Sequence, residues 1–235
     1  MTYTVLGHCQ RTGRFGIGIA TFSIGVGLYC HGVRAGTGVT MTQAFVNQDN
    51  NGLGLRLLEQ GFGAKAVLAR LLANDPDFEY RQVGVIDRNG IAAAYTGPRT
   101  RGWSGDVTGP GYVAFGNGLV NQGVVDAIAA WFLAEPALEL EQRLLMGIEA
   151  GRAAGGQSND QRRKTERSAA LLVYSEYDYP EIDLRVDLHA RAVEELRRVL
   201  TEFKRYETFY RERGRNPRKA VTQDEFVASL QASST

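Results

Sequence analysis

The residue best suited to chemistry in this sequence is Thr2, because it becomes the first residue of the chain if Met1 is removed. A threonine is small enough for that removal to be expected. The freed residue then carries both a hydroxyl and an α-amine, and an α-amine with a pKa of about 7.7–8.0 is partly neutral near pH 7. A neutral amine can take the hydroxyl proton directly or through one water. Thr2 could therefore transfer an acyl group through an ester without a separate histidine base.

Three other patterns suggest different chemistry, but each lacks part of the motif that it resembles. GIGIAT at 16–21 has no third glycine of a dinucleotide-binding motif, and GFGAKA at 61–66 lies between two predicted helices instead of following a strand. GWSG at 102–105 is one residue short of the GxSxG nucleophile elbow. We therefore do not expect a nucleotide site or a serine-hydrolase site.

The histidines and cysteines predict no metal site. His8, His31 and His189 are far apart in the sequence, and Cys9 and Cys30 form no CxxC pattern. We expect neither a metal nor a cofactor. Few cysteines and no basic-then-apolar leader indicate a cytoplasmic protein in a reducing compartment.

Charge is unevenly distributed, although the formal net charge is only +1. Residues 152–167 hold five Arg or Lys against two acidic residues, and residues 191–219 hold ten against five. Such segregation could attract an anionic partner, but glutamates at helical spacing in 194–212 are also typical of a solvated helix face. No apolar run reaches the roughly 18 residues needed to span a bilayer. We expect no membrane association and no nucleic-acid partner.

Apolar periodicity predicts alternating groups of strands and helices. Phe15, Ile17 and Ile19 alternate with small residues, which predicts a strand whose glycine-lined face packs closely on another element. The predicted strands are 2–8, 15–23, 39–44, 82–86, 92–95, 111–115, 168–174 and 182–186. The predicted helices are the pairs 53–61 with 66–74 and 124–133 with 138–150, followed by 190–213 and 222–231.

This order of elements predicts an α+β fold: a four-layer αββα sandwich of two largely antiparallel sheets flanked by helix pairs. Several strands come as adjacent hairpins, for example around DRNG at 87–90, and leave no room for crossover helices. We expect one domain over 2–213 that ends in the long charged helix. A short helix and a polar tail then occupy 214–235.

Several segments in order resemble one bacterial family, the domain of unknown function 1028 family, over about residues 2–200. They are MTYTV (1–5), RAGTG (34–38), TQAFVN (42–47), GLGLRLL (52–58), YRQVGVID (80–87), YTG (95–97), GN (116–117), AAGG (153–156), SAALLV (168–173) and DLRVD (183–187) with His189. Each motif is modest, but ten motifs in the same order are specific.

The resemblance implies an Ntn (N-terminal nucleophile) hydrolase-like fold. In that superfamily the nucleophile is the first residue of the mature chain, which matches Thr2. Two departures stand out. The turn after AAGG, at 157–167, is longer and more basic than the family's short glycine- and aspartate-containing turn. Residues 21–23 also lack the Ser-Lys or Ser-His pair that the family tends to carry, so no cationic or imidazole group assists Thr2 there.

Four polar residues near predicted strand ends are the candidates to complete a site around Thr2. An amide can donate to a developing oxyanion without carrying charge, which makes Asn117 and Gln43 the first candidates. Ser23 and Asn47 are candidates for substrate binding. The structural alternatives are turn formation for Asn117 and core hydrogen bonding for Gln43.

The predicted function is therefore hydrolysis of a small amide, such as an N-acyl or carbamoyl group on a metabolite, with Thr2 as nucleophile. The alternative is a non-catalytic binding or scaffold protein of the same fold. In that case the basic loop 157–167 and the helix in 191–219 would engage an anionic partner. The glycine-lined strand face also predicts a homo-oligomer, most simply a two-fold dimer.

Overall fold

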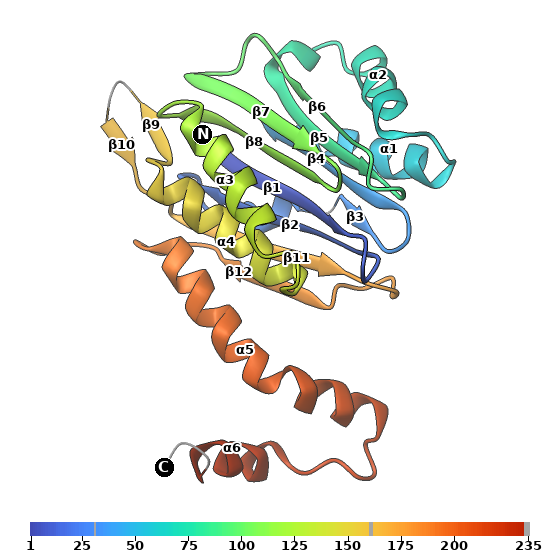
Figure 1. The fold of residues 1–235 in the computed structure, drawn as a ribbon, viewed down its shortest axis with the longest axis vertical. Coiled ribbons are helices and arrows are strands. Elements are labelled where there is room, and N and C mark those ends of the chain that lie inside the picture. Colours follow the sequence, from blue (N-terminus) through green and yellow to red (C-terminus); the bar gives the residue numbers. More distant parts are fainter. Residues whose placement is uncertain (31, 160–161, 233–235) are drawn as a thin grey trace. The chain divides into compact units, whose positions relative to one another are not determined.

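The structure is a computed structural model that describes residues 1–30, 32–159 and 162–232. It contains two compact units, Met1–Leu196 and Arg197–Thr235 (Figure 1). Each unit is described by itself. The boundary predicted between residues 213 and 214 stays a prediction.

Two antiparallel sheets form the centre of the first unit. The larger sheet has the order β10-β9-β8-β1-β2-β11-β12, and β7 also pairs with β8. Its strands are β1 (Thr2–Cys9), β2 (Arg14–Thr21), β7 (Trp103–Gly109), β8 (Tyr112–Leu119), β9 (Gln157–Asn159), β10 (Arg162–Lys164), β11 (Ser168–Tyr174) and β12 (Ile182–Val186). The smaller sheet, in the order β3-β4-β5-β6, consists of β3 (Val33–Arg34), β4 (Gly38–Ala44), β5 (Arg81–Asp87) and β6 (Ala92–Thr96). The predicted antiparallel pairing is confirmed.

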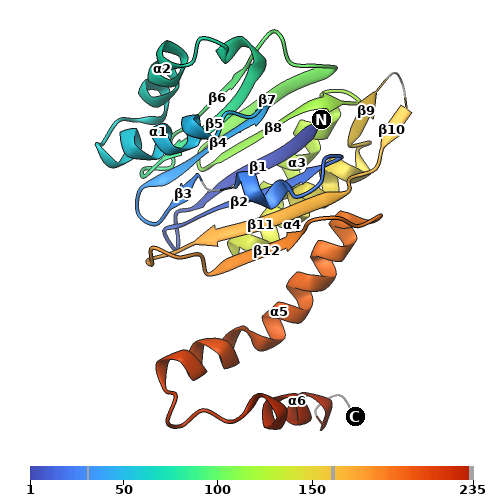
Figure 2. The ribbon, with the colours of Figure 1, turned by 180° about the vertical axis from the view of Figure 1, so that it is seen from behind.

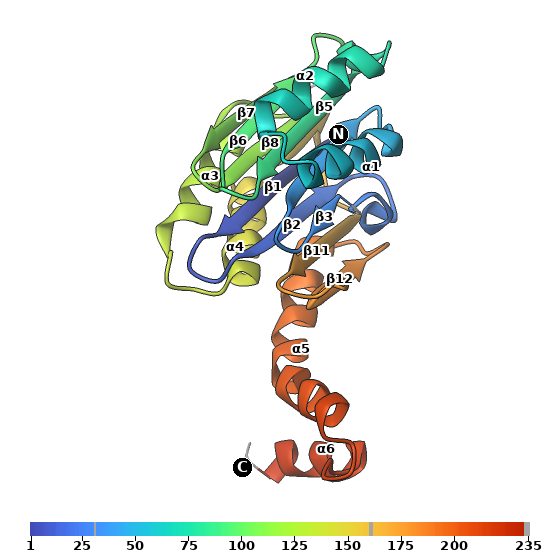
Figure 3. The same cartoon turned by 90° about the vertical axis from the view of Figure 1, so that its right-hand side faces the viewer.

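Helix pairs cover the outer faces of the two sheets, as the edge-on view in Figure 3 shows. The pair α1 (Gln48–Glu59) and α2 (Ala64–Asn74) packs on β4, β5 and β6. The pair α3 (Gly123–Ala134) and α4 (Leu140–Ala153) packs on β1, β2 and β8. Short 3-10 helices occupy Val26–Tyr29 and Phe78–Tyr80. The predicted mixed α+β class with two antiparallel sheets is confirmed.

The main hydrophobic core lies between the sheets, where alternate residues of their strands meet. Leu6, Ile17 and Phe115 of the larger sheet are fully buried in one cluster with Met41 and Ile86 of the smaller sheet. Burial of these side chains stabilises the stack by about 1.5–3 kcal/mol for each of them. The core therefore fixes which face of β1 points toward the smaller sheet.

The glycine-lined face of β2 is confirmed, and the element that packs on it is α4. A Cβ at Gly16 would lie 2.8 Å from Leu144 Cδ1, and a Cβ at Gly18 would lie 3.2 Å from Ile148 Cγ1. Glycine therefore lets the helix approach the strand closely. Because α4 already covers this face, it gives no reason for a second copy to bind there. The predicted homo-oligomer stays a prediction, and the glycine-lined face no longer supports it.

Four strands were not predicted. The strand β7 carries half-buried polar residues such as Ser104 and exposed Asp106, so its sequence lacks an apolar alternation. The segment 157–167, predicted as a basic loop, contains the short strands β9 and β10, and its residues 160–161 lie outside the described residues. Strands of three residues without a buried apolar face give no periodic signal. The strand β3, only two residues long, was missed for the same reason.

The second unit is helical. The helix α5 (Ala192–Arg215) begins in the first unit and continues into the second, where α6 (Gln223–Ala232) follows it. The Phe209 and Phe226 rings stack with centroids 4.2 Å apart, and Tyr206 meets Phe226 edge-on. Both predicted C-terminal helices are confirmed. Across the described part of the chain, no helix is both long and apolar enough to cross a bilayer.

Candidate functional site

Thr2 begins β1, a strand in the middle of the larger sheet. It is paired with Thr21 of β2 on one side and with Asn117 of β8 on the other. Residues directly opposite each other in an antiparallel sheet point to the same face. The side chains of Thr2, Thr21 and Asn117 therefore share one face, and Thr4 on that face reaches Gln43 of the smaller sheet. The structure thus brings Thr2 and Asn117 together at the edge of the space between the sheets.

The Thr2 hydroxyl is oriented by Thr21. Their Oγ1 atoms lie 3.1 Å apart, and the Thr21 hydroxyl donates to the Met1 carbonyl oxygen at 2.6 Å. A hydroxyl has one proton to donate, so the Thr2 hydroxyl is the donor to Thr21 in this arrangement. Thr21 is buried and also accepts a hydrogen bond from the Ser23 N–H at 3.2 Å. Sequence analysis did not single out Thr21, although the register of the first hairpin could have placed it opposite Thr2.

A buried amide cluster stands beside this pair, with Gln82 at its centre. The Gln82 Oε1 accepts hydrogen bonds from Gln43 Nε2 at 2.9 Å and from Asn117 Nδ2 at 3.1 Å. The Gln43 Oε1 accepts from the Thr4 hydroxyl at 2.6 Å, and Gln43 Nε2 also approaches the Phe115 carbonyl at 3.5 Å. Gln43 is thus engaged at both ends of its amide. It can hold its neighbours in place, but it has no spare donor for a substrate.

We expect Gln82→Leu to destabilise the protein by about 2–4 kcal/mol, since it leaves the buried amides of Gln43 and Asn117 without their shared acceptor. Gln82 has no exposed surface. Urea unfolding followed by circular dichroism measures the change in the free energy of unfolding. The exposed Gln122, whose side chain caps nothing, provides the matched control Gln122→Leu. A loss below about 0.5 kcal/mol in Gln82→Leu would contradict this role of the cluster.

Ser23 lies next to Thr21, because it follows the end of β2. Its carbonyl accepts a hydrogen bond from the Ser168 hydroxyl at 2.9 Å, which fixes this segment to β11. Its own side chain is exposed. Ser23 is therefore placed at the rim of the N-terminal site.

Asn47 has a structural task at the start of α1. Its side chain accepts a hydrogen bond from the Asp49 N–H at 3.2 Å and donates to Asp75 Oδ2 at 3.1 Å. Burial alone would raise the pKa of Asp75, but hydrogen bonds from Arg81, Asn47 and Asn50 outweigh it and lower this pKa. Among the described residues, no contact joins Asn47 to Thr2. These two hydrogen bonds engage both the oxygen and the nitrogen of the Asn47 side chain.

Gln157 is the residue near Thr2 that sequence analysis missed as a site candidate. Its Oε1 accepts a hydrogen bond from the Phe22 N–H at 2.8 Å. In the sheet, β8 and β1 lie between β9 and β2 (Figures 1 and 2), so this bond joins β9 to the residue that follows β2 across two strands. Gln157 has no exposed surface, and its Nε2 has no hydrogen-bond partner among the described residues. An unpaired buried donor is costly, which makes it a candidate to bind a ligand oxygen.

The only sequence signal for Gln157 is that it directly follows the AAGG segment, and it was interpreted as the first residue of a loop. In the structure that segment leads into β9, where Gln157 pairs with Leu119. The backbone at Val120 and Gly156 is also joined by a hydrogen bond of 3.1 Å. Gln157 is thus held by backbone pairing as well as by its own side chain.

The chain's amino end is partly buried at this site. Burial lowers the pKa of the Met1 α-amine from its ordinary value of 8.0. Met1 lies over Gly118, where a Cβ would collide with the Met1 side chain. The α-amine that Thr2 would carry lies one residue further into the sheet, so we expect its pKa to be lowered in the same direction.

The cysteines and histidines show no metal site in the part of the chain that the structure describes. Both cysteines are free and buried. No three His, Cys, Asp or Glu side chains within the described ranges are placed to hold a metal ion. His189 lies just before α5, and its Nδ1 accepts a hydrogen bond from the Arg191 N–H at 3.1 Å.

Comparisons with known proteins identify the family. The chain matches the family of unknown function DUF1028 over residues 2–196. It is also similar to the crystal structure of protein SPO2555 from Silicibacter pomeroyi, described as DUF1028, with 28% identity and a TM-score of 0.75. That similarity covers 86% of this chain and 88% of the other. A search of curated proteins finds no match. Because the family match spans most of the sequence, this chain belongs to DUF1028, a family of unknown function.

Proposed function

We propose that this protein is an Ntn-type hydrolase that cleaves a small amide, with Thr2 as the nucleophile after loss of Met1. The observation that carries the proposal is the place of Thr2 at the start of β1, where its Oγ1 lies 3.1 Å from Thr21 Oγ1 and its side chain shares a face with Asn117. The helix–sheet–sheet–helix stacking supports an Ntn-like fold. Burial lowers the pKa of the amino terminus below its ordinary value of 8.0, which favours the neutral form of an α-amine at this place.

The reaction would proceed in two acyl-transfer steps. The neutral Thr2 α-amine takes the hydroxyl proton as the Thr2 oxygen attacks the amide carbon, and this forms a tetrahedral oxyanion. The C–N bond then breaks, the leaving amine receives the proton, and the acyl group remains on Thr2 as an ester. A water molecule then gives up a proton to the Thr2 α-amine and attacks the ester carbon. The C–O bond breaks, the acid leaves, and the amine returns the proton to the Thr2 oxygen.

The oxyanion needs a donor that is already in place, and Gln157 Nε2 fits this role. Its amide is anchored through Oε1 to Phe22, the residue after Thr21, and its Nε2 is buried without a hydrogen-bond partner in the described part of the chain. Asn117, directly opposite Thr2, would add a second donor through the amide hydrogen not given to Gln82. We assign Gln43 a positioning role, because its amide is already engaged.

The substrate's acyl group would take the space that Met1 occupies over Gly118. Loss of Met1 would therefore free both the amine and the room beside it. Gly118 has a φ of 61°, so a side chain there would be strained as well as obstructive. Ser23, on the opposite side at the end of β2, would lie at the entrance.

The pH dependence of hydrolysis tests this proposal. We expect kcat/KM to rise with pH as the Thr2 α-amine loses its proton and to level off below pH 8, because burial lowers the pKa of an amine. A panel of acyl p-nitroanilides followed by absorbance supplies the measurement. A rate that falls as pH rises across this range would contradict a neutral-amine base, and Thr2→Ser should keep the wild-type profile.

A further inference from the structure

We infer that the substrate of this site carries a carboxylate, which Arg101, Lys164 and Arg167 would bind at the entrance. The inference rests on the proposed function for the position of the bond that is cleaved. These three cationic side chains come from two separate parts of the sequence and flank the start of β1 from both sides. Each is placed by contacts that can be followed from Thr2.

Arg101 stands on the β8 side of Thr2. Its carbonyl accepts a hydrogen bond from the Gly118 N–H at 2.9 Å, and Gly118 is the residue against which Met1 packs. Its guanidinium lies 5.3 Å from the centroid of the Phe45 ring, just beyond the end of β4. Arg101 is exposed, so its charge is available to a ligand.

Lys164, in β10, and Arg167, just before β11, both contact the residue that follows β2. Both cations lie over the ring of Phe22, the residue after Thr21, with Lys164 Nζ at 5.6 Å and Arg167 Cζ at 4.7 Å from its centroid. The Arg167 Nε also donates to the Phe22 carbonyl at 2.8 Å, which fixes the guanidinium beside the strand end. Phe22 is joined to Gln157 through its N–H, so the same residue connects these cations to the proposed oxyanion donor.

Arg101, Lys164 and Arg167 have no acidic partner in the described ranges. No carboxylate there lies at ion-pair distance from any of these three side chains. Arg99, two residues before Arg101, is instead paired with Glu79 at 2.8 Å. Glu166, between the other two cations in sequence, is buried and paired with Arg152 at 3.4 Å.

A carboxylate is the group that this arrangement would bind best. A guanidinium presents parallel N–H donors that match both oxygens of a carboxylate, and a charge-assisted hydrogen bond is stronger than a neutral one. Cations without a carboxylate partner among the described residues also attract anions. A neutral amide would leave these cations in water and gain nothing from them. The inferred substrate class is therefore a small amide with a carboxylate on its acyl or its amine side.

Two pairs of probes test the inference by calorimetric titration of the full chain carrying Thr2→Ala, which prevents turnover. Glutaryl and pentanoyl p-nitroanilide differ by a carboxylate on the acyl side, and N-pentanoylglycine and its glycinamide differ on the amine side. We expect the charged member of at least one pair to bind about tenfold more tightly. Arg101→Gln, or Lys164→Gln with Arg167→Gln, should remove most of that preference. Equal binding within both pairs, or no binding of either charged probe, would overturn the inference.

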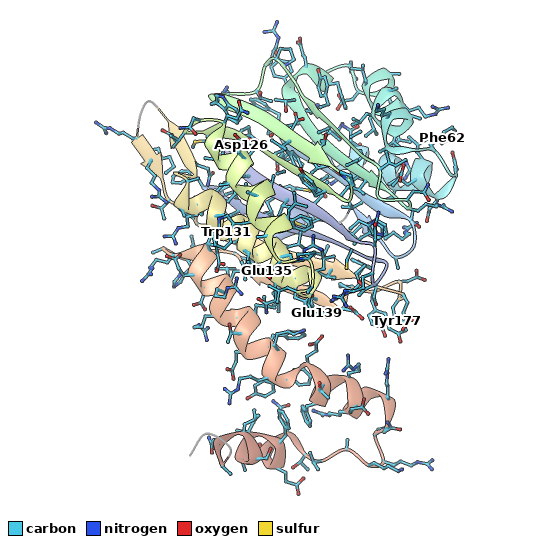
Figure 4. The ribbon with its side chains drawn as sticks, in the orientation of Figure 1. Phe62, Asp126, Trp131, Glu135, Glu139 and Tyr177 are labelled. Carbon is cyan, nitrogen blue, oxygen red and sulfur yellow. The ribbon has the colours of Figure 1, made fainter. Side chains whose placement is uncertain are left out.

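Arg70→Gln is the matched control. The Arg70 guanidinium lies 3.8 Å from the centroid of the Phe62 ring, so it is an exposed arginine on an aromatic ring like Arg167. Phe62 lies next to α2, on the opposite side of the first unit from β10 (Figure 4). This control should keep the full preference, and an equal loss in Arg70→Gln would overturn the assignment. Wild-type turnover is measured separately. Charge-selective binding without turnover removes the proposed hydrolysis and leaves the carboxylate site intact.

Discussion

Replacing Thr2 by alanine should abolish hydrolysis of any amide that the protein cleaves, with a loss in kcat on the order of 10⁴-fold or more. Alanine removes the attacking oxygen while keeping the backbone pairs with Thr21 and Asn117. Thr2→Ser should retain part of the activity, because it keeps a hydroxyl on the same residue as the α-amine. Steady-state kinetics with acyl p-nitroanilides measures both variants.

Thr108→Ala provides the control for Thr2→Ala, since Thr108 is an exposed threonine in the same sheet. It should leave kcat unchanged. If Thr2→Ala turned over substrate as fast as the wild type, the nucleophile would lie elsewhere. The alternative of a binding or scaffold protein, with its basic segments 157–167 and 191–219 facing an anionic partner, would then be favoured.

Replacing Gln157 by glutamate should lower kcat by about 10²–10³-fold at a pH where the introduced carboxyl is ionised. The carboxylate can still accept the hydrogen bond from the Phe22 N–H, but it has lost the donor that would meet the oxyanion. Binding of substrate should change much less than kcat, because the donor acts mainly in the transition state.

The pH profile separates this role of Gln157 from a purely structural one. A protonated carboxyl can donate a hydrogen bond, so activity of Gln157→Glu should fall as pH rises, opposite to the wild type. Gln157→Met, which never donates, should be slow at every pH and covers the case in which the buried carboxyl prevents folding. If Gln157→Met kept the wild-type kcat, Gln157 would not be the oxyanion donor.

Much of the fold could be predicted from sequence because apolar periodicity reports which face of an element is buried. Phe15, Ile17 and Ile19 alternate with small residues, and in the structure they face the second sheet while Gly16 and Gly18 face α4. The helix pairs were similarly clear. The strands that were not predicted, such as β7 and the β9–β10 pair, are short or polar. They lie at the edge of the sheet, and their pairing depends on the rest of the sheet.

Less of the candidate site than of the fold could be predicted from the sequence. Thr2 could be proposed from its position and chemistry alone, and Asn117 does lie opposite it. Gln157 lies 155 positions further along the chain, and only the order of strands in the sheet brings it to the start of β1. Whether an amide is free or engaged, as in Gln157 and Gln43, depends on tertiary hydrogen bonds that no local pattern encodes.

The most direct test of the central claim is the intact mass of the protein purified from its native host. The proposed mechanism needs a free α-amine on Thr2, so we expect a mass that lacks Met1. In that form the amine and hydroxyl of Thr2 belong to one residue, beside Thr21. A mass that retains Met1 in full would contradict the mechanism, because the proposed base would then be an amide nitrogen with no proton affinity near pH 7.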